Sequence, residues 1–261
     1  MTDHHGGDLR SAAQRRSGIV RMLRSAGQVR AVDLANDLGV THETVRKDLV
    51  MLESRGLLRR VHGGALPVES LSYEPDVSER TVQSEEKRRI AEAAAALVPD
   101  QGAVLLDAGS TVAALADAFP QTAQVTVVTN ALPIALSLLG FPLVSVHTVG
   151  GRVRPTTMAE VDHWALRALA EVRVDVAFLG TNACSVKHGL STPDDSEAAV
   201  KRAMIAAAER RVLLADHTKF TRSSVFTYAD LSDIDVLVTD EGLPTDVRRD
   251  IGQCGVEVVT A

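Results

Sequence analysis

Residues 104–115 read VLLDAGSTVAAL, an apolar run that breaks at a turn of small and polar residues. A short apolar run followed by such a turn is typical of a buried strand, and the small residues after it favour a helix. The backbone N–H groups in the first turn of a helix have no helical acceptor and bind phosphate readily. The stretch therefore predicts a strand, a turn and a helix that together could hold a phosphate.

The same pattern continues along the rest of the chain. Apolar runs predict strands over residues 103–107, 125–130, 143–149, 174–180, 211–215, 235–240 and 256–259, and helical stretches separate most of them. Continuous apolar strands that alternate with helices are typical of a mostly parallel sheet covered by helices on both faces. We expect a doubly wound α/β domain over residues 84–261.

In such sheets, ligands bind at the carboxyl ends of the strands. Five of the predicted strands are followed by glycine, hydroxyl, amide or basic residues. Glycine permits close approach of the backbone, hydroxyl and amide groups form hydrogen bonds, and arginine and lysine supply positive charge. This composition suits a phosphorylated sugar. The residues expected to bind it are Asp107, Gly109, Ser110, Thr111, Thr129, Asn130, Gly150, Gly151, Arg152, Gly180, Thr181, Asn182 and Lys219.

Some of these positions allow a second interpretation. Glu197 and Lys201 lie four residues apart, so they could form an exposed helical ion pair worth a few tenths of a kcal/mol. They also follow the loop after the fourth strand, so they could equally line the ligand pocket. Asp107 and Asp216 could simply cap the helices that follow them. Trp164, the only tryptophan, lies at helical spacing and favours packing in the core or at an interface.

The charge of the chain is unevenly distributed. Residues 1–67 contain eleven Arg or Lys and seven Asp or Glu, a net charge of +4, whereas the remainder contains seventeen and twenty-seven, a net charge of −10. A basic head on an acidic body predicts that the head binds nucleic acid. Residues 1–15 are expected to be a flexible tail and residues 68–83, where the apolar periodicity fades, a linker.

Residues 16–67 predict a winged helix-turn-helix. Helical patterns end at Gly27 and Gly39, a third helix with Thr41 as its N-cap runs toward Gly56, and a hairpin turns around Gly63 and Gly64. In this fold the third helix enters the major groove and the hairpin reaches the DNA backbone. The residues expected to contact DNA are Thr41, His42, Glu43, Thr44, Arg46, Lys47, Arg59, Arg60 and His62.

Composition also excludes several classes of protein. No apolar run approaches the roughly 18 residues of a membrane span, and the N-terminus lacks the apolar core of a signal peptide. The two cysteines, Cys184 and Cys254, lie far apart without the spacing of metal ligands. We expect a cytoplasmic protein with reduced thiols and without a metal, cofactor or membrane partner.

Several stretches together resemble one family, the DeoR family of bacterial transcriptional regulators. They are TVRKDLVMLESRGLLRRVHGGA, LLDAGST, VVTNALPIA, VGGRV, FLGTNACSVKHGLSTPDDSEAAVKRAMI and LLADHTKF, and the likeness extends from about residue 16 to residue 242. The resemblance implies a winged helix-turn-helix joined to a sensor domain related to ribose-5-phosphate isomerase. It also implies repression of a sugar catabolism operon until a phosphorylated sugar releases the protein from operator DNA. Since paired half-sites need two recognition helices, we expect a homo-oligomer, a dimer or tetramer.

The resemblance adds detail to the site. It implies that Glu197 and Lys201 lie in the pocket, and the chain is most similar to actinobacterial regulators of fructose uptake, so fructose 1-phosphate is the favoured effector. Where relatives usually have a glycine after Gly-Thr-Asn, this chain has Ala183. If that position required a positive φ, alanine would cost on the order of 1 kcal/mol.

An enzyme is the alternative: a phosphosugar isomerase or deaminase with an accessory DNA-binding domain. Such chemistry needs a poised acid or base, and Asp107, Asp194, Asp195 and Glu197 are available. However, the isomerases that the chain resembles carry an Asp-Gly-Ala-Asp-Glu stretch where this chain has GTNACSVKHGLSTPDD. We therefore expect a regulator without catalytic residues. The identity of the sugar phosphate, the operator sequence and the direction of the effector's action stay open at this stage.

Overall fold

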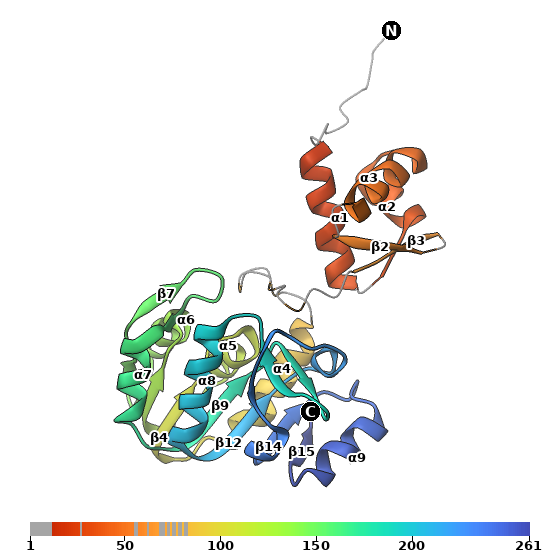
Figure 1. Ribbon diagram of the computed structural model, residues 1–261. Helices are drawn as coiled ribbons and strands as arrows, with labels where there is room; N and C mark the ends of the chain where they lie inside the picture. Colours follow the sequence, from red (N-terminus) through yellow and green to blue (C-terminus); the bar gives the residue numbers. More distant parts are fainter. Residues whose placement is uncertain are drawn as a thin grey trace. The chain divides into compact units, whose positions relative to one another are not determined.

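The computed structural model describes residues 12–26, 28–54, 57–61, 63–67, 71, 74, 77, 80 and 83–261. The chain divides into two compact units, Met1–Ser70 and Leu71–Ala261 (Figure 1). The division lies within the expected linker, residues 68–83. Of the residues expected to bind DNA, His62 lies outside the described residues, and only the backbone of Arg59 is described.

Among its described residues, the first unit contains three helices and a small antiparallel sheet. Its elements are α1 (Ala12–Ala26), β1 (Val29–Arg30), α2 (Ala31–Leu38), α3 (His42–Ser54), β2 (Leu58–Val61) and β3 (Gly64–Pro67), and the strand order is β1-β3-β2. Ile19, Leu23 and Leu34 pack with Val45 and Leu49 in its core. Helix α2 ends at Gly39 in the left-handed conformation, as the sequence predicts. These elements confirm the winged helix-turn-helix.

The prediction of a tail that extends to residue 15 was wrong, because helix α1 begins at Ala12. Alanine and arginine are strong helix formers, so the first turn is favoured locally. Arg15 and Arg16 also donate from Nε to the two carboxylate oxygens of Asp48, each at 2.6 Å. Since Asp48 is buried in α3, these ion pairs fasten the start of α1 to the third helix.

The second unit is built on a seven-stranded sheet. Its strands are β4 (Gln101–Leu106), β5 (Gln124–Thr129), β6 (Ser145–Thr148), β9 (Val174–Gly180), β12 (Ala208–Leu214), β14 (Val236–Thr239) and β15 (Glu257–Thr260). The order is β15-β14-β12-β9-β4-β5-β6, and all neighbouring strands are parallel. All seven predicted strands are present in this sheet.

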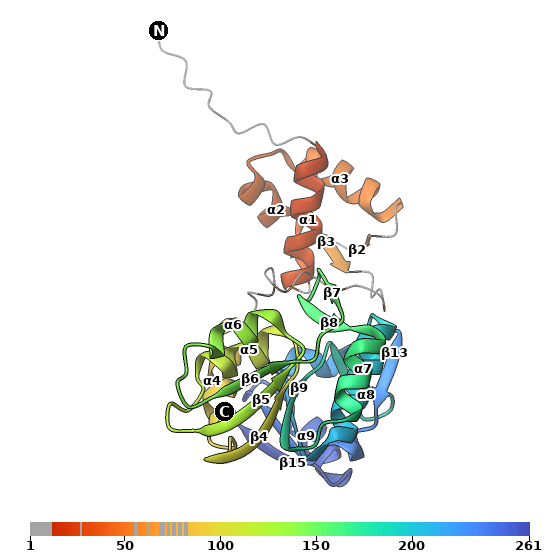
Figure 2. The same ribbon diagram turned by 90° about the vertical axis from the view of Figure 1, so that its left-hand side faces the viewer.

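Helices cover both faces of the sheet, as the continuous apolar strands predict. The helices are α4 (Ser84–Ala95), α5 (Ser110–Asp117), α6 (Leu132–Leu138), α7 (Asp162–Ala170), α8 (Asp195–Ala207) and α9 (Thr245–Gln253). Residues of α4, α5 and α6 pack with Val104 and Leu106 on one face, and residues of α7, α8 and α9 pack with Leu105 on the other. Figure 2 shows α5 and α6 on one side of the strands and α7 and α8 on the other.

Two smaller sheets were not predicted. One pairs β7 (Arg152–Arg154) with β8 (Ala159–Val161), and the other contains β10 (Ala183–Ser185), β11 (Gly189–Thr192) and β13 (Phe226–Ala229). Short 3-10 helices, η2 (His217–Thr221) and η3 (Leu231–Asp233), connect strands of the second half. These strands contain three or four residues each, which is too short to show a clear periodicity in the sequence.

The strand order contains one reversal. After β4 the chain continues to β5 and β6 on one side, and after β9 it continues to β12, β14 and β15 on the other. The topological switch point therefore lies between β4 and β9, and ligands of open α/β sheets bind in the crevice at such a point. Within the described part of the chain, no helix combines the length and the apolar composition that a membrane crossing requires.

Candidate functional site

A buried ion pair occupies the switch point. Asp107 follows β4, and its Oδ2 accepts a hydrogen bond from the backbone N–H of Gly180 at 3.0 Å. The Nζ of Lys201, from α8, contacts the same oxygen and donates to the carbonyl oxygen of Gly180 at 2.9 Å. Three elements thus meet through Asp107, Gly180 and Lys201. Together with Glu197 we call them the switch-point site.

The environment keeps Lys201 charged. Burial alone would lower the pKa of Lys201, but the charge of Asp107, together with Tyr228, Glu197 and the hydrogen bond to Asp107, outweighs burial and raises the pKa above its usual value. Nζ also lies 5.5 Å from the ring centre of Tyr228, a cation–π contact. The Tyr228 hydroxyl donates to the carbonyl oxygen of Gly180 at 3.1 Å, and burial raises the pKa of this phenol. The Asp107 carboxylate is therefore paired with a buried cation.

Glu197 lies on the same buried face of α8. Glu197 and Lys201 are 5% and 4% exposed, so the interpretation as an exposed ion pair was wrong. The Thr157 hydroxyl donates to Oε1 of Glu197 at 2.5 Å and the Thr192 hydroxyl to Oε2 at 3.4 Å, while Nη1 of Arg154 lies 3.2 Å from Oε1. Burial raises the pKa of Glu197.

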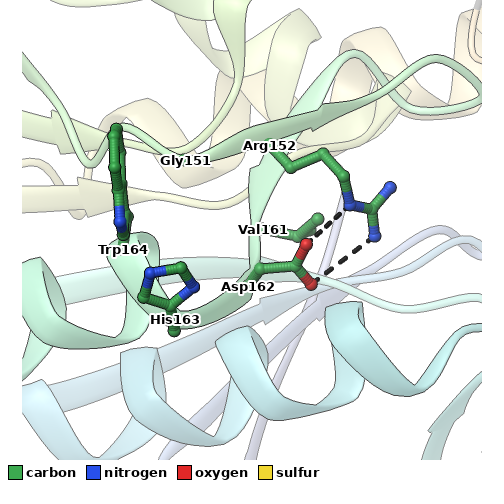
Figure 3. Close-up of a pocket in the computed structure, with 6 residues that line it drawn as sticks. All are labelled: Gly151, Arg152, Val161, Asp162, His163 and Trp164. Carbon is green, nitrogen blue, oxygen red and sulfur yellow. Dashed lines mark hydrogen bonds and ion pairs between the residues drawn. The ribbon is translucent and has the colours of Figure 1, made fainter.

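Arg154 contacts the switch-point site and was not predicted from the sequence. Its guanidinium reaches Glu74 Oε2 at 2.6 Å and Asp194 Oδ2 at 3.0 Å, in addition to Glu197. The predicted residue, Arg152, instead pairs at the surface with Asp162, 2.6 Å between Nε and Oδ2 (Figure 3). Alternate residues of a strand lie on the same face, so recognition of strand β7 would have made Arg154 a candidate together with Arg152.

A second cationic group lies at the start of α4. Lys87 is buried, and its Nζ donates to the carbonyl oxygen of Arg80 at 2.9 Å. Burial, with a further contribution from the charge of Lys219, lowers the pKa of Lys87 to about 8. Burial also lowers the pKa of Lys219, whose Nζ lies 3.9 Å from Asp216 Oδ2. Lys87 was not predicted, although it shares the buried helical face of Ile90.

Several predicted hydroxyl groups bind the protein's own backbone. The Thr129 hydroxyl donates to the carbonyl oxygen of Leu106 at 2.7 Å and accepts from the N–H of Ala131 at 3.0 Å. The Thr181 hydroxyl donates to the carbonyl oxygen of Ala183 at 2.8 Å. Ala183 lies in β10, pairs with Ser191 of β11 and has no positive φ, so the expected strain does not arise. Thr129 and Thr181 therefore order the turns after β5 and β9.

One side-chain polar atom of Asn130 has no partner among the described residues. Its Nδ2 donates to the carbonyl oxygen of Glu160 at 3.3 Å, whereas its buried Oδ1 has no hydrogen-bond partner among the residues that the structure describes. The Glu160 carboxylate accepts from the N–H of Gly150 at 2.7 Å. A Cβ at Gly151 would lie 2.5 Å from the carbonyl oxygen of Val161, so glycine is needed there for packing.

The turn after β4 has the predicted form. Gly109 has a φ of 137° and precedes α5, which begins at Ser110, and Thr111 is buried in its first turn. The interpretation of Asp216 as a cap is confirmed, because Asp216 accepts from the N–H of Thr218 at 3.0 Å. Asp107 has no such role and belongs to the switch-point site.

The recognition helix presents the predicted side chains. The hydroxyl of Thr41 accepts from the N–H of Thr44 at 3.2 Å, which confirms the N-cap. On the exposed face, Nε and Nη2 of Arg46 donate to the two carboxylate oxygens of Glu43 at 2.8 and 2.7 Å. Lys47 is exposed beside them. Glu43 therefore orients the guanidinium of Arg46 on the exposed face of the helix.

The hairpin is fixed to the recognition helix by one residue. The backbone N–H and Nε of Arg60 donate to the two oxygens of Glu53, at 2.8 and 2.5 Å. This fixes the position of β2 relative to the end of α3.

Two surface hollows lie elsewhere, and Trp164 lines both. Each has a volume of about 240 Å³; one is formed with Arg167 and Glu171, and the other with Arg152 and His163 (Figure 3). Trp164 is 63% exposed, so the prediction that it packs in the core of this unit was wrong. The His163 ring contacts it edge-on at 5.9 Å between centroids.

The thiols and the acidic groups do not form a metal site in the described part of the chain. Cys184 is buried and Cys254 half-buried, and both are free thiols. Burial raises the pKa of the Cys184 thiol to about 12, so this thiol is unreactive.

A winged helix-turn-helix joined to an α/β domain with a polar switch point defines a DNA-binding transcriptional regulator. Residues 15–71 match the DeoR-like helix-turn-helix domain, and residues 82–241 match the DeoR C terminal sensor domain. The chain belongs to the DeoR family, and it is a transcriptional repressor of that type rather than an enzyme.

Relatives from distant organisms are similar over nearly the whole chain. The HTH-type transcriptional regulator GlpR of Haloferax volcanii is 37% identical over 95% of this chain and 97% of its own length. A protein of Escherichia coli O157:H7 that carries the name of an aga operon transcriptional repressor is 34% identical, over 95% and 93%. Ribose 5-phosphate isomerase A of Methanocaldococcus jannaschii aligns with a TM-score of 0.40 and 18% identity, over 53% of this chain and 55% of that chain.

Proposed function

We propose that this repressor senses a phosphorylated sugar at the switch-point site and that binding releases it from the operator of a sugar catabolism operon. Fructose 1-phosphate is the favoured effector, on the sequence resemblance described above. The observation that carries the proposal is the burial of three charged groups, Asp107, Glu197 and Lys201, at the switch point of the sheet. Burial of charge is expensive, and perturbed ionisable groups cluster at binding sites.

The cationic groups support a phosphate. Lys87 and Lys219 are close enough for the charge of Lys219 to lower the pKa of Lys87, so an added anion would stabilise both ammonium groups. Helix α5, which packs on α4, offers the N–H groups of its first turn after the turn at Gly109. We assign the phosphate to this region.

A hydrogen-bond acceptor supports the sugar. The buried Oδ1 of Asn130 is an acceptor that a ligand hydroxyl could satisfy. Buried polar groups select ligands that can pair with them, because an analogue that lacks the hydroxyl leaves them unsatisfied. The site therefore favours a hydroxyl-rich anion over inorganic phosphate.

On the DNA side, Arg46 would read a base edge while Lys47 and Arg60 would neutralise phosphates. A single recognition helix reads a short sequence, and paired half-sites require two copies. We therefore propose a homo-oligomer, a dimer or tetramer, as the DNA-binding form. Since effector and operator binding are linked, each must weaken the other by the same factor.

Titration calorimetry with the full chain tests the effector. Fructose 1-phosphate should bind more tightly than fructose 6-phosphate, ribose 5-phosphate and inorganic phosphate, and it should release operator DNA in a gel-shift assay. Lys87→Gln should weaken binding, whereas Lys187→Gln, at an exposed turn, should not. Tighter binding of another sugar phosphate would overturn the fructose assignment, and absence of binding by every phosphorylated sugar would overturn the sensor function.

A further inference from the structure

Three described residues near the start of the second unit, Glu74, Val77 and Arg80, bind to the rest of that unit. Val77 donates its N–H to the carbonyl oxygen of Thr156 at 2.7 Å. The carbonyl oxygen of Arg80 accepts from Nζ of Lys87 at 2.9 Å. The third residue is Glu74, whose side chain is 3% exposed. We call residues 74–80 the connecting segment, because they follow the end of the DNA-binding unit by four residues.

Glu74 is bound as a ligand would be. Its Oε1 accepts from Nη2 of Arg80 at 2.7 Å and from Nδ2 of Asn182 at 2.9 Å, and its Oε2 lies 2.6 Å from Nη1 of Arg154. Two guanidinium groups and an amide make strong, charge-assisted bonds to a carboxylate or a phosphate. Of these partners, Asn182 was expected to bind the effector, and Arg154 also contacts Glu197 of the switch-point site.

The charge of the Glu74 carboxylate affects two neighbouring groups, Arg154 and Glu197. Arg154 is shared by three carboxylates, those of Glu74, Asp194 and Glu197. After burial, the charge of Glu74 is the next cause of the raised pKa of Glu197. Departure of Glu74 would therefore leave Arg154 to the other two carboxylates and to an incoming ligand.

We propose that Glu74 is an internal ligand of the sensor site, and that a phosphorylated effector displaces the connecting segment by competing for Arg154, Asn182 and Lys87. This inference rests on the proposed function, since it assigns the regulation of the same site. A phosphate bound to Lys87 removes the donor that holds the Arg80 carbonyl, and the polar groups that hold Glu74 become available to the effector. The occupancy of the site thereby decides whether Glu74, Val77 and Arg80 stay bound to the second unit.

Replacement of Glu74 by Gln should change effector binding and operator binding in opposite directions. If Glu74 and the effector exclude each other, Glu74→Gln shifts the population toward the displaced state, so the effector binds more tightly and the operator more weakly. We expect changes of about tenfold, within the range of ordinary coupling. Glu92→Gln is the matched control, because Glu92 also pairs with an arginine, Arg88, but at the surface.

The rate of limited trypsin cleavage after Arg80 measures, without any ligand, how often the connecting segment leaves the second unit. Full-length Glu74→Gln should be cleaved about tenfold faster than the wild type and Glu92→Gln. Equal rates in the three proteins overturn the proposal. Fructose 1-phosphate at millimolar concentration should accelerate cleavage of the wild type, and binding without acceleration overturns the displacement.

The two proposals fail differently. If no phosphorylated sugar binds the wild type, the effector assignment falls, while the cleavage rate of Glu74→Gln still decides whether Glu74 holds the segment. If Glu74→Gln does not fold, Asn182→Asp replaces it, because a second carboxylate beside Glu74 should also accelerate cleavage after Arg80. An unchanged rate in that variant overturns the proposal as well.

Discussion

Replacement of Lys201 by methionine tests whether the switch-point site is a buried ion pair. Lys201 and Asp107 are both almost completely buried, and Nζ of Lys201 contacts the Asp107 carboxylate and the carbonyl oxygen of Gly180. Methionine has a similar length but no charge. The variant therefore leaves the Asp107 carboxylate buried with the Gly180 N–H as its described partner.

The magnitude follows from that uncompensated charge. Removal of one partner of a buried pair costs about 3 to 5 kcal/mol. In a domain of this size, each kcal/mol lowers the midpoint of thermal unfolding by about 2 to 4 °C, so the second unit should lose about 6 to 20 °C. Circular dichroism or calorimetry of the full chain measures the loss. Replacement of Asp107 by Asn in the same chain should restore part of it, because no buried charge remains.

The pKa of Lys201 determines how the stabilisation by this ion pair depends on pH. Because Asp107 raises the pKa of Lys201 despite burial, the stabilisation is complete below the pKa of the unfolded chain and is lost only as pH rises through the folded pKa. The difference between wild type and Lys201→Met should thus be constant from pH 6 to pH 9. Arg88→Met, which breaks an exposed pair, is the control and should change little. A loss below about 1 kcal/mol for Lys201→Met would refute the reasoning, since exposed pairs contribute that much.

Three further predictions follow from the other groups. The affinity for a sugar phosphate should fall by up to about tenfold per unit above pH 8, where Lys87 loses its proton. Calorimetry should show this fall in the wild type and not in Lys87→Met, and a flat wild-type profile would contradict it. Arg46→Ala should weaken binding of operator DNA about ten- to a hundredfold and of random DNA less, whereas Lys47→Ala should weaken both alike. Fluorescence anisotropy distinguishes them, and equal losses for Arg46→Ala would make it a phosphate contact. Trp164 is expected at a subunit interface, so iodide should quench its fluorescence more strongly as the protein is diluted; quenching that is independent of concentration excludes it from the interface.

The large sheet could be predicted because its strands are buried on both faces. In β4, Val104 and Leu106 pack with one layer of helices and Leu105 with the other, so every position in the run must be apolar. Such runs are visible in the sequence without knowledge of the partners. The recognition helix was predictable for a different reason, since its cap at Thr41 and its buried positions Val45 and Leu49 depend on local spacing.

The charged part of the site was harder to predict. Arg154 lies on a three-residue strand, and Glu74 lies in a polar stretch whose partner Asn182 is 108 residues away. A buried charge depends on partners that the fold supplies, which local spacing does not reveal. Lys87 is the exception, because its spacing from Ile90 was visible in the sequence as a lysine on an apolar face.

The hydroxyl residues illustrate an ambiguity that sequence reasoning alone does not resolve. Turns after parallel strands and phosphate cradles both favour threonine, serine, asparagine and glycine. Thr129 bonds Ala131 of its own turn and Leu106 of the neighbouring strand β4, and Thr181 bonds Ala183 of its own turn. Asn130 is distinguished from them only by the buried Oδ1 that the fold leaves over.

The arrangement of charges explains why such a site suits a sensor. General acid–base chemistry needs a group that can exchange a proton with the substrate. Here Lys201 binds Asp107, and two threonine hydroxyls and Arg154 surround Glu197, so both carboxylates are already committed. A ligand bound there meets groups that hold it but no poised base. Its binding energy is then available to change the equilibrium between two arrangements of the chain, provided that the ligand prefers one of them. The segment that competes for the same polar groups, through Glu74, supplies that preference.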